Sequence, residues 1–148
     1  MHHILSERGD TLVEVMLSIA VVGMVIGLSY STANRAVKTG RAAQEQTEAL
    51  KLAQTQLERL KSVAESAPAS VFTSGVYCID AGLVVVPASS TAAYTARCKG
   101  QGGGQLYEQS LQYVAASNDT FTARVTWVPA TTIAATNTVS VSYRLHKQ

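Results

Sequence analysis

Residues 10–34 read DTLVEVMLSIAVVGMVIGLSYSTAN, and this stretch decides how the chain is organised. From Val15 to Asn34 it contains no charged residue. A helix needs roughly 20 apolar residues to cross the hydrocarbon core of a membrane, so the length fits one span. A buried core helix is the weaker alternative, because in so small a protein it would carry a polar stripe. We therefore predict a transmembrane helix over these residues.

An ordinary secretory signal peptide is the main rival interpretation. Such a peptide has a positively charged start, a short apolar run and small residues at a cleavage site beyond that run. Residues 29–33 include suitable small side chains, but the apolar run is long and Arg8 is the only arginine or lysine before it. The basic residues that follow the span, between positions 35 and 41, would by themselves favour a cytoplasmic location for the C-terminal part.

The helix is expected to continue beyond the span. From Ala36 to Glu65 there is no proline and a single glycine, and the composition is rich in strong helix formers. Pro68 ends this pattern, so we predict a helix from about residue 11 to residue 65. Small or apolar residues follow one stripe of its second half: Ala36, Ala43, Leu50, Ala53, Leu57, Leu60 and Ala64. This stripe indicates that the rest of the chain packs against the second half.

Two segments near the C-terminus alternate between apolar and polar residues, which is typical of strands with one buried face. They are Thr120–Val128 and Thr138–Leu145, and the short linker between them suits an antiparallel pair. Weaker strand candidates are Gly75–Ile79, Leu83–Val86 and Leu111–Val114, while residues 99–104, KGQGGG, are expected to form a loop. Phe121, Val125, Trp127, Val141 and Tyr143 are expected to pack on Leu50, Leu57 and Leu60. The predicted fold is α+β, with one long N-terminal helix laid on a small antiparallel sheet.

The residues in front of the span carry the functional signal. Gly9 and Asp10 are followed by Thr-Leu-Val-Glu, ending at Glu14, and then directly by the apolar run. This order resembles the class III leader of type IV prepilins and pseudopilins. The resemblance implies that a prepilin peptidase cleaves after Gly9 on the cytoplasmic side. The mature chain would then begin at Asp10, where an apolar residue is usual in the family, and would keep its whole apolar helix.

Glu14 is the residue to which the resemblance gives a role in assembly. A carboxylate at the start of a transmembrane span is costly to bury without a partner. The resemblance implies a pairing with a mature N-terminus, its own or a neighbour's, since an α-amino group is positive below a pKa of about 8. Such a pairing would set the axial register of a filament. The alternative is that Glu14 is interfacial and solvated.

The resemblance implies four segments: a leader (1–9), a transmembrane and assembly helix (10–34), its amphipathic continuation (35–67) and an extracytoplasmic globular domain (68–148). The implied function is a structural subunit of a type IV pilus-like filament, most simply a minor pilin. Other pilin subunits, the prepilin peptidase, the inner-membrane assembly platform and the membrane are its expected partners. It would be a single-pass protein of the cytoplasmic membrane that reaches the cell surface in the filament. A pseudopilin of a type II secretion or competence system is one alternative, and a membrane-anchored binding protein that never polymerises is another.

The two cysteines, Cys78 and Cys98, are too far apart for a C-x-x-C redox or zinc motif. On the oxidising side of a membrane they would form a disulfide that closes a loop of about 21 residues and contributes about 3 kcal/mol. Two free buried thiols are the alternative.

We do not expect an enzyme, a cofactor, a metal site or a small-molecule substrate. Without residues 1–9 the only histidine is His146, so a Ser-His-Asp triad or a histidine-rich metal site cannot be assembled. Residues 100–104 lack the G-K-[ST] of a phosphate loop. Nucleic-acid binding is also not expected, because Arg97 and Lys99 have no aromatic residues beside them and the formal net charge is only +2.

Overall fold

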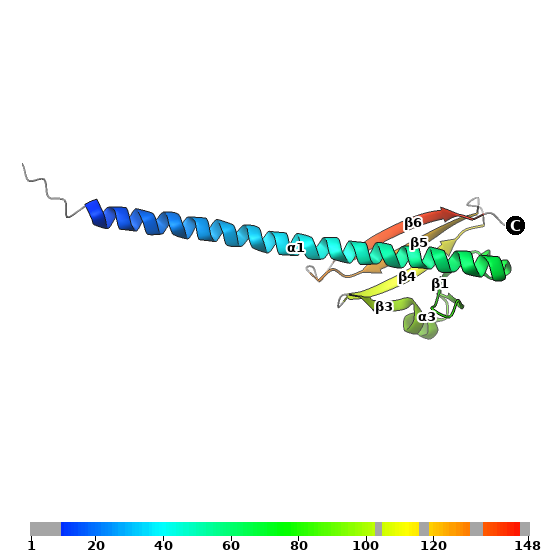
Figure 1. The fold of residues 1–148 in the computed structure, drawn as a ribbon. Helices are drawn as coiled ribbons and strands as arrows, with labels where there is room; N and C mark the ends of the chain where they lie inside the picture. The colour runs from blue at the N-terminus through cyan, green and yellow to red at the C-terminus, as the bar shows by residue number, and fades with distance from the viewer. Residues whose placement is uncertain (1–9, 103–104, 116–118, 131–134, 146–148) are drawn as a thin grey trace, which may run out of the picture. The chain divides into compact units, whose positions relative to one another are not determined.

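The computed structural model describes residues 10–102, 105–115, 119–130 and 135–145. It is an α+β fold in which a long N-terminal helix packs on a small antiparallel sheet (Figure 1). The chain forms two units, Met1–Gly40 and Arg41–Gln148. The elements are α1 (Asp10–Ser66), α2 (Pro68–Val71), β1 (Gly75–Ile79), β2 (Val85–Pro87), α3 (Thr91–Cys98), β3 (Lys99–Gly102), β4 (Gln105–Tyr113), β5 (Thr120–Trp127) and β6 (Asn137–Arg144).

The strands form one antiparallel sheet in the order β2-β1-β4-β5-β6. β3 also pairs with β4. It lies on the same edge of β4 as β1 does, but beside the first residues of β4. The two strands with the clearest alternation, β5 and β6, pair along their whole length, as predicted. The strand prediction for Gly75–Ile79 is confirmed as β1, while β2 begins two residues later than expected and β4 is longer than expected.

The main core lies between the second half of α1 and one face of the sheet. From α1 it takes Ala49, Ala53, Leu57, Leu60 and Val63. From the sheet it takes Tyr77, Ile79, Tyr107, Leu111, Tyr113, Phe121, Ala123, Val125 and Trp127. The expected burial of Leu57 and Leu60 against the C-terminal hairpin is therefore confirmed, as is the buried face of β5. Alternation with a period of two residues predicts that face correctly, because side chains of a strand point to opposite sides in turn.

The predicted packing is wrong at two positions. Leu50 is 41% exposed, because the buried stripe of α1 passes through Ala49 instead before it reaches Ala53. Tyr143 is 36% exposed. The Lys61 ammonium group lies over its ring in a cation–π contact, 4.4 Å from the ring centroid. Val141, also expected in the core, is half-buried against it.

Gln56 joins α1 to the sheet where β1 and β4 separate. Its amide oxygen accepts a hydrogen bond from the Ile79 backbone amide (3.0 Å), and its Nε2 donates to the Ile79 carbonyl oxygen (3.0 Å). The same Nε2 donates to the side-chain oxygen of Gln109 (2.9 Å). Ile79 lies beyond the last residue of β1 that pairs with β4, so the Gln56 amide replaces a missing strand neighbour.

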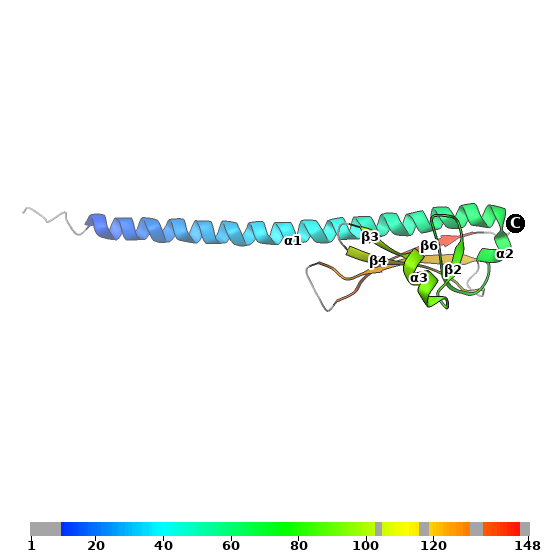
Figure 2. The same cartoon turned by 90° about the horizontal axis from the view of Figure 1, so that it is seen from below.

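A second, smaller core lies on the opposite face of the sheet, under α3. It consists of Cys78, Val86, Tyr94 and Cys98. Cys78 alternates with Tyr77 and Ile79 along β1, and those two residues face the main core. Figure 2 shows α1 and α3 on opposite sides of the strands. Neither α3 nor β3 is expected from the sequence; residues 99–102, predicted as part of a loop, are a strand paired with β4.

The buried tyrosines make the domain sensitive to alkaline pH. Burial raises the pKa of Tyr107 to about 12, and the hydrogen bond to the Glu48 carboxylate acts in the same direction. Burial also raises the pKa of Tyr94 to about 12. A tyrosine whose pKa is raised by folding stabilises the folded state fully below its unfolded pKa of about 10, and this contribution is lost as the pH rises toward the folded value.

We therefore expect the free energy of unfolding to fall between about pH 10 and pH 12. Tyr107→Phe should make this fall less steep, because it removes one of the buried hydroxyl groups that titrate. Urea denaturation followed by the fluorescence of the single tryptophan, Trp127, measures the dependence. If the free energy of unfolding falls equally steeply with pH in the wild type and in Tyr107→Phe, the expectation is contradicted.

Candidate functional site

The first half of α1 is an apolar helix with exposed side chains. Its large apolar side chains between Leu12 and Val37 are 55% to 74% exposed. Among the described residues, α1 is the helix that is long and apolar enough to cross a membrane. The sequence prediction of a span is thus met in length and composition, and the helix begins at Asp10, one residue earlier than expected.

Three hydroxyl side chains inside this apolar stretch bond to the helix backbone itself. The hydroxyl groups of Ser18, Ser29 and Thr32 each donate a hydrogen bond to the carbonyl oxygen four residues earlier, at 2.8 to 2.9 Å. Bonds of this kind remove the cost of placing a free hydroxyl group in an apolar environment. The stretch therefore stays compatible with lipid in spite of its polar residues.

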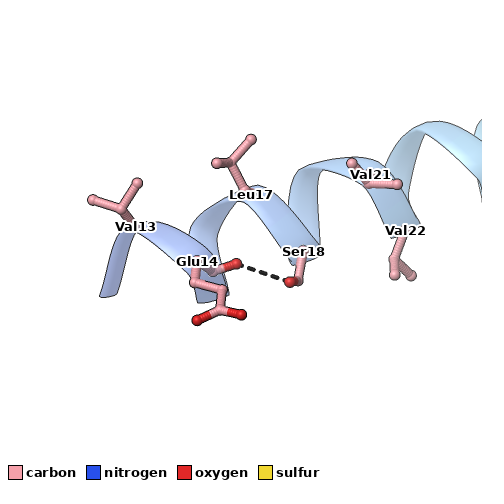
Figure 3. Close-up of a pocket in the computed structure, with 6 residues that line it drawn as sticks. All are labelled: Val13, Glu14, Leu17, Ser18, Val21 and Val22. Carbon is pink, nitrogen blue, oxygen red and sulfur yellow. Dashed lines mark hydrogen bonds between the residues drawn. The ribbon is translucent and has the colours of Figure 1, made fainter. Parts of the chain in front are cut away.

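Glu14 stands in the first turns of α1, at one end of a shallow groove along the helix surface (Figure 3). One ridge of the groove consists of Val13, Leu17 and Val21, and the other of Glu14, Ser18 and Val22. Each ridge follows residues four apart. Such grooves receive the side chains of another helix when two helices pack. The Ser18 hydroxyl group donates its hydrogen bond to the backbone carbonyl oxygen of Glu14 and not to the Glu14 carboxylate (Figure 3).

The structure describes only part of the predicted processing site. Gly9 lies outside the described residues, and of Asp10 only the helical backbone is described. Within the described residues the ion pairs are Arg97–Asp80 and Lys99–Glu108, so no cation of that part of the chain pairs with Glu14. The partner of this carboxylate remains a prediction.

The predicted disulfide between Cys78 and Cys98 is present. Their Cα atoms are 5.9 Å apart, and both side chains are buried. The bond joins β1 to the last residue of α3, directly before β3. It thereby closes the segment that contains β2 and α3.

Sequence reasoning missed Glu45, a buried carboxylate on α1 that is 8% exposed. One of its oxygens accepts a hydrogen bond from Trp127 Nε1 and the other from the Ala130 backbone amide, each at 3.1 Å. Glu45 therefore fastens the end of β5 and the start of the following loop to the helix. The stripe predicted from the sequence passes through Ala43 and Leu50, so it gave no signal for this position.

Within the described residues, no cluster of three or more histidine, cysteine, aspartate or glutamate side chains could hold a metal ion. What the site offers chemically is an apolar helix surface with one carboxylate near its start, which suits association with lipid or with other helices. The chain matches no protein-family model, no curated protein and no solved structure.

Proposed function

We propose that this chain is a structural subunit, of the minor pilin kind, of a type IV pilus-like filament. A prepilin peptidase removes residues 1–9, and α1 holds the mature subunit in the cytoplasmic membrane until the assembly platform inserts it. In the filament, the apolar half of α1 packs against the same helix of other subunits. The domain that contains the sheet lies outside the cytoplasm.

The observation that carries this proposal is the exposed apolar half of α1 with a carboxylate at its start. Burial of a single Val, Leu or Ile side chain stabilises by about 1.5–3 kcal/mol. Eleven such side chains are exposed between Leu12 and Val37. In water they would make the isolated chain aggregate, so the helix needs a cover. Lipid provides one before assembly, and neighbouring helices provide one afterwards, through the groove that begins at Glu14.

Glu14 distinguishes a polymerising helix from a simple anchor. An anchor is inserted more easily with an apolar residue at this position, because a carboxylate in the span is costly. In a filament of packed helices, the Glu14 carboxylate pairs with the α-amino group of Asp10. This pairing favours one axial register of the helices over all others. The disulfide Cys78–Cys98 supports the outer location of the domain, because such bonds persist in oxidising compartments.

Replacement of the carboxylate tests the proposal. Glu14→Val should leave membrane insertion, cleavage and the outer domain intact but should reduce incorporation into filaments. Glu14→Asp should be intermediate, because the charge remains while its reach is shorter by one methylene. The ratio of subunit in sheared filaments to subunit in membranes is the measurement.

Thr47→Val is the matched control, since it changes an exposed polar residue of α1 that lies outside the groove and carries no charge. Its incorporation should equal that of the wild type. Normal incorporation of Glu14→Val would show that the carboxylate does not set the register.

A further inference from the structure

β6 forms one edge of the sheet, and its outer side pairs with no other strand in the described part of the chain (Figure 1). An edge strand presents a row of unpaired backbone N–H and C=O groups, to which another strand can add. Folded proteins protect such edges with short strands, proline, charged side chains, bulges or a covering element. The two edges of this sheet differ in this protection.

The edge opposite β6 is protected. It is formed by β2 and β3, which have three and four residues. Val86 of β2 also belongs to the small core under α3. β6 has none of these devices, since its eight residues pair with β5 in unbroken register and include no proline and no lysine. Its one charged residue, Arg144, is the last of the strand.

The hydrogen bonds to β5 use every second residue of β6. The Leu145 amide donates to the Asp119 carbonyl oxygen, 3.0 Å away, and these two residues lie opposite each other in the register of β5 and β6. In an antiparallel pair, opposite residues alternate between bonded and non-bonded pairs. Counting back from Leu145, the residues of β6 that bond to β5 are therefore Tyr143, Val141 and Val139.

The residues between them, Thr138, Ser140 and Ser142, direct their backbone amides and carbonyl groups away from β5. Within the described residues, these outward groups have no backbone partner. The three side chains are small and exposed, so they leave room for another chain beside the strand. The edge thus offers three donors and three acceptors at the spacing of a β-strand.

A strand added at this edge would also extend the main core. Val139 and Val141 are half-buried on the face of β6 that points to α1. Lys61 of α1 lies over Tyr143 on the same face, and Leu50 precedes Lys61 by about three turns on this side of the helix. Leu50 is 41% exposed. Apolar side chains at every second position of an added strand would cover Leu50 and the two valines.

We propose that β6 binds an extended segment of another extracytoplasmic protein, with apolar residues at every second position. The backbone of this segment pairs with Thr138, Ser140 and Ser142, and its apolar side chains lie beside Val139 and Val141. The location outside the cytoplasm rests on the proposed function. The contact goes beyond the packing of α1 helices, because it joins a different protein to the outer domain.

A second copy of the chain fits this edge poorly. The first residue of β6, Asn137, lies opposite Trp127, and Trp127 bonds to Glu45. Tyr143, near the end of β6, lies against Lys61, so β6 runs in the same direction as α1. Antiparallel pairing of β6 with β6 of a copy would turn the second halves of α1 in opposite directions, whereas copies anchored in one membrane share a direction. The other edge of a copy offers at most four residues in a row.

A synthetic peptide tests the edge directly. The probe has about eight residues, valine and threonine in alternation, with a lysine at each end for solubility. It is added to the full chain in detergent micelles, and NMR follows the hydrogen exchange of each amide. We expect the peptide to slow exchange at Thr138, Ser140 and Ser142 about tenfold or more, because these amides become bonded. The amides of Val139 and Val141 already bond to β5 and should change little.

Methylated peptides are the matched controls. In antiparallel pairing the threonines of the probe lie opposite the outward residues of β6, and its valines point to α1. N-methylation of the threonines removes the amide hydrogens that face β6 and should abolish the protection. N-methylation of the valines changes the far edge of the probe and should leave the protection in place. Absence of protection by the unmodified probe, or equal protection by the two methylated forms, would overturn the inference.

Two variants of the chain test the same contact from the other side. Ser140→Pro removes one outward amide without removing a bond to β5, and proline is accepted on an edge strand whose N–H faces solvent. Its melting temperature should stay near that of the wild type, and the probe should no longer protect the edge. Ser140→Ala keeps the amide and should behave as the wild type. Equal protection in Ser140→Pro and Ser140→Ala would contradict the inference, and the methylated peptides decide the question independently of either variant.

A photo-reactive diazirine residue in place of Ser140 distinguishes the occupants in native membranes. A cross-link to an extended segment of a different protein supports the inference, whereas a cross-link to another copy of this chain, or no product, overturns it. The peptide experiment needs no filament, so its result is separate from that of Glu14→Val. Protection by the probe together with normal incorporation of Glu14→Val would leave the edge contact standing and the filament proposal wrong. The reverse pair of results would overturn the edge contact alone.

Discussion

Gly9→Val is expected to leave the leader on nearly every copy of the chain and to remove the protein from filaments. In the family that the sequence resembles, the peptidase cuts after a glycine that stands directly before the mature chain. A branched side chain at this position blocks the cut, so residues 1–9 would remain and the α-amino group of Asp10 would never form. Intact-mass measurement of protein extracted from membranes shows the effect directly.

Ala33→Leu is the control for that experiment. Ala33 is one of the small residues that an ordinary signal peptidase could use at the far end of the apolar run. If the cut falls after Gly9 instead, Ala33→Leu leaves processing unchanged. A block by Ala33→Leu together with normal processing of Gly9→Val would establish an ordinary signal peptide.

Trp127→Ala should destabilise the outer domain by about 3–5 kcal/mol, the usual range for a buried large aromatic residue. Trp127 is 4% exposed, and its ring centroid lies 5.9 Å from that of Tyr107. Its loss also removes the indole donor from the buried Glu45 carboxylate, which adds a desolvation penalty to the cavity. Urea denaturation of the full chain in detergent, followed by near-ultraviolet circular dichroism of the tyrosines, measures the change.

Two further variants divide this effect into its parts. Trp127→Phe keeps most of the apolar volume but has no N–H group, so it should lose less stability than Trp127→Ala. Val128→Ala changes the adjacent residue, which is 48% exposed, and should change stability by less than about 0.5 kcal/mol. Unchanged stability of Trp127→Ala would mean that the buried face of β5 is assigned incorrectly.

The elements with a regular period can be predicted from the sequence. The predicted ends of α1 agree with the structure to within one residue, because the helix contains no proline and Pro68 gives a clear stop. Alternation alone predicts β5 and β6. The disulfide also follows from the sequence, once the chain is taken to cross a membrane.

The buried face of α1 was predicted less accurately than its ends, because two polar residues belong to its buried stripe. Glu45 and Gln56 are 8% and 1% exposed, and each bonds to groups from distant parts of the chain. Hydrophobic periodicity places such residues on the outside, which moves the predicted stripe toward Leu50. Their burial depends on donors and acceptors supplied by Trp127 and Ile79, which a local pattern does not contain.

The short elements escape prediction for a different reason. α3 has eight residues, rich in alanine and threonine, too few for a clear helical period. β3 contains two glycines and has no apolar alternation; its pairing with β4 decides its conformation. At the candidate site, the sequence predicts the exposed apolar helix and the place of Glu14. The groove beside Glu14 and the position of β6 at the edge of the sheet depend on three-dimensional geometry that no sequence pattern indicates.

The mature N-terminus is the most direct test of the central claim. The filament account predicts that protein purified from its native membrane or filaments begins at Asp10 and retains the whole of α1. Intact-mass and N-terminal peptide measurements determine this residue. A chain that begins near Asn34 has lost the apolar half of α1, and such a result would contradict the account, because no anchor and no helix for assembly would remain.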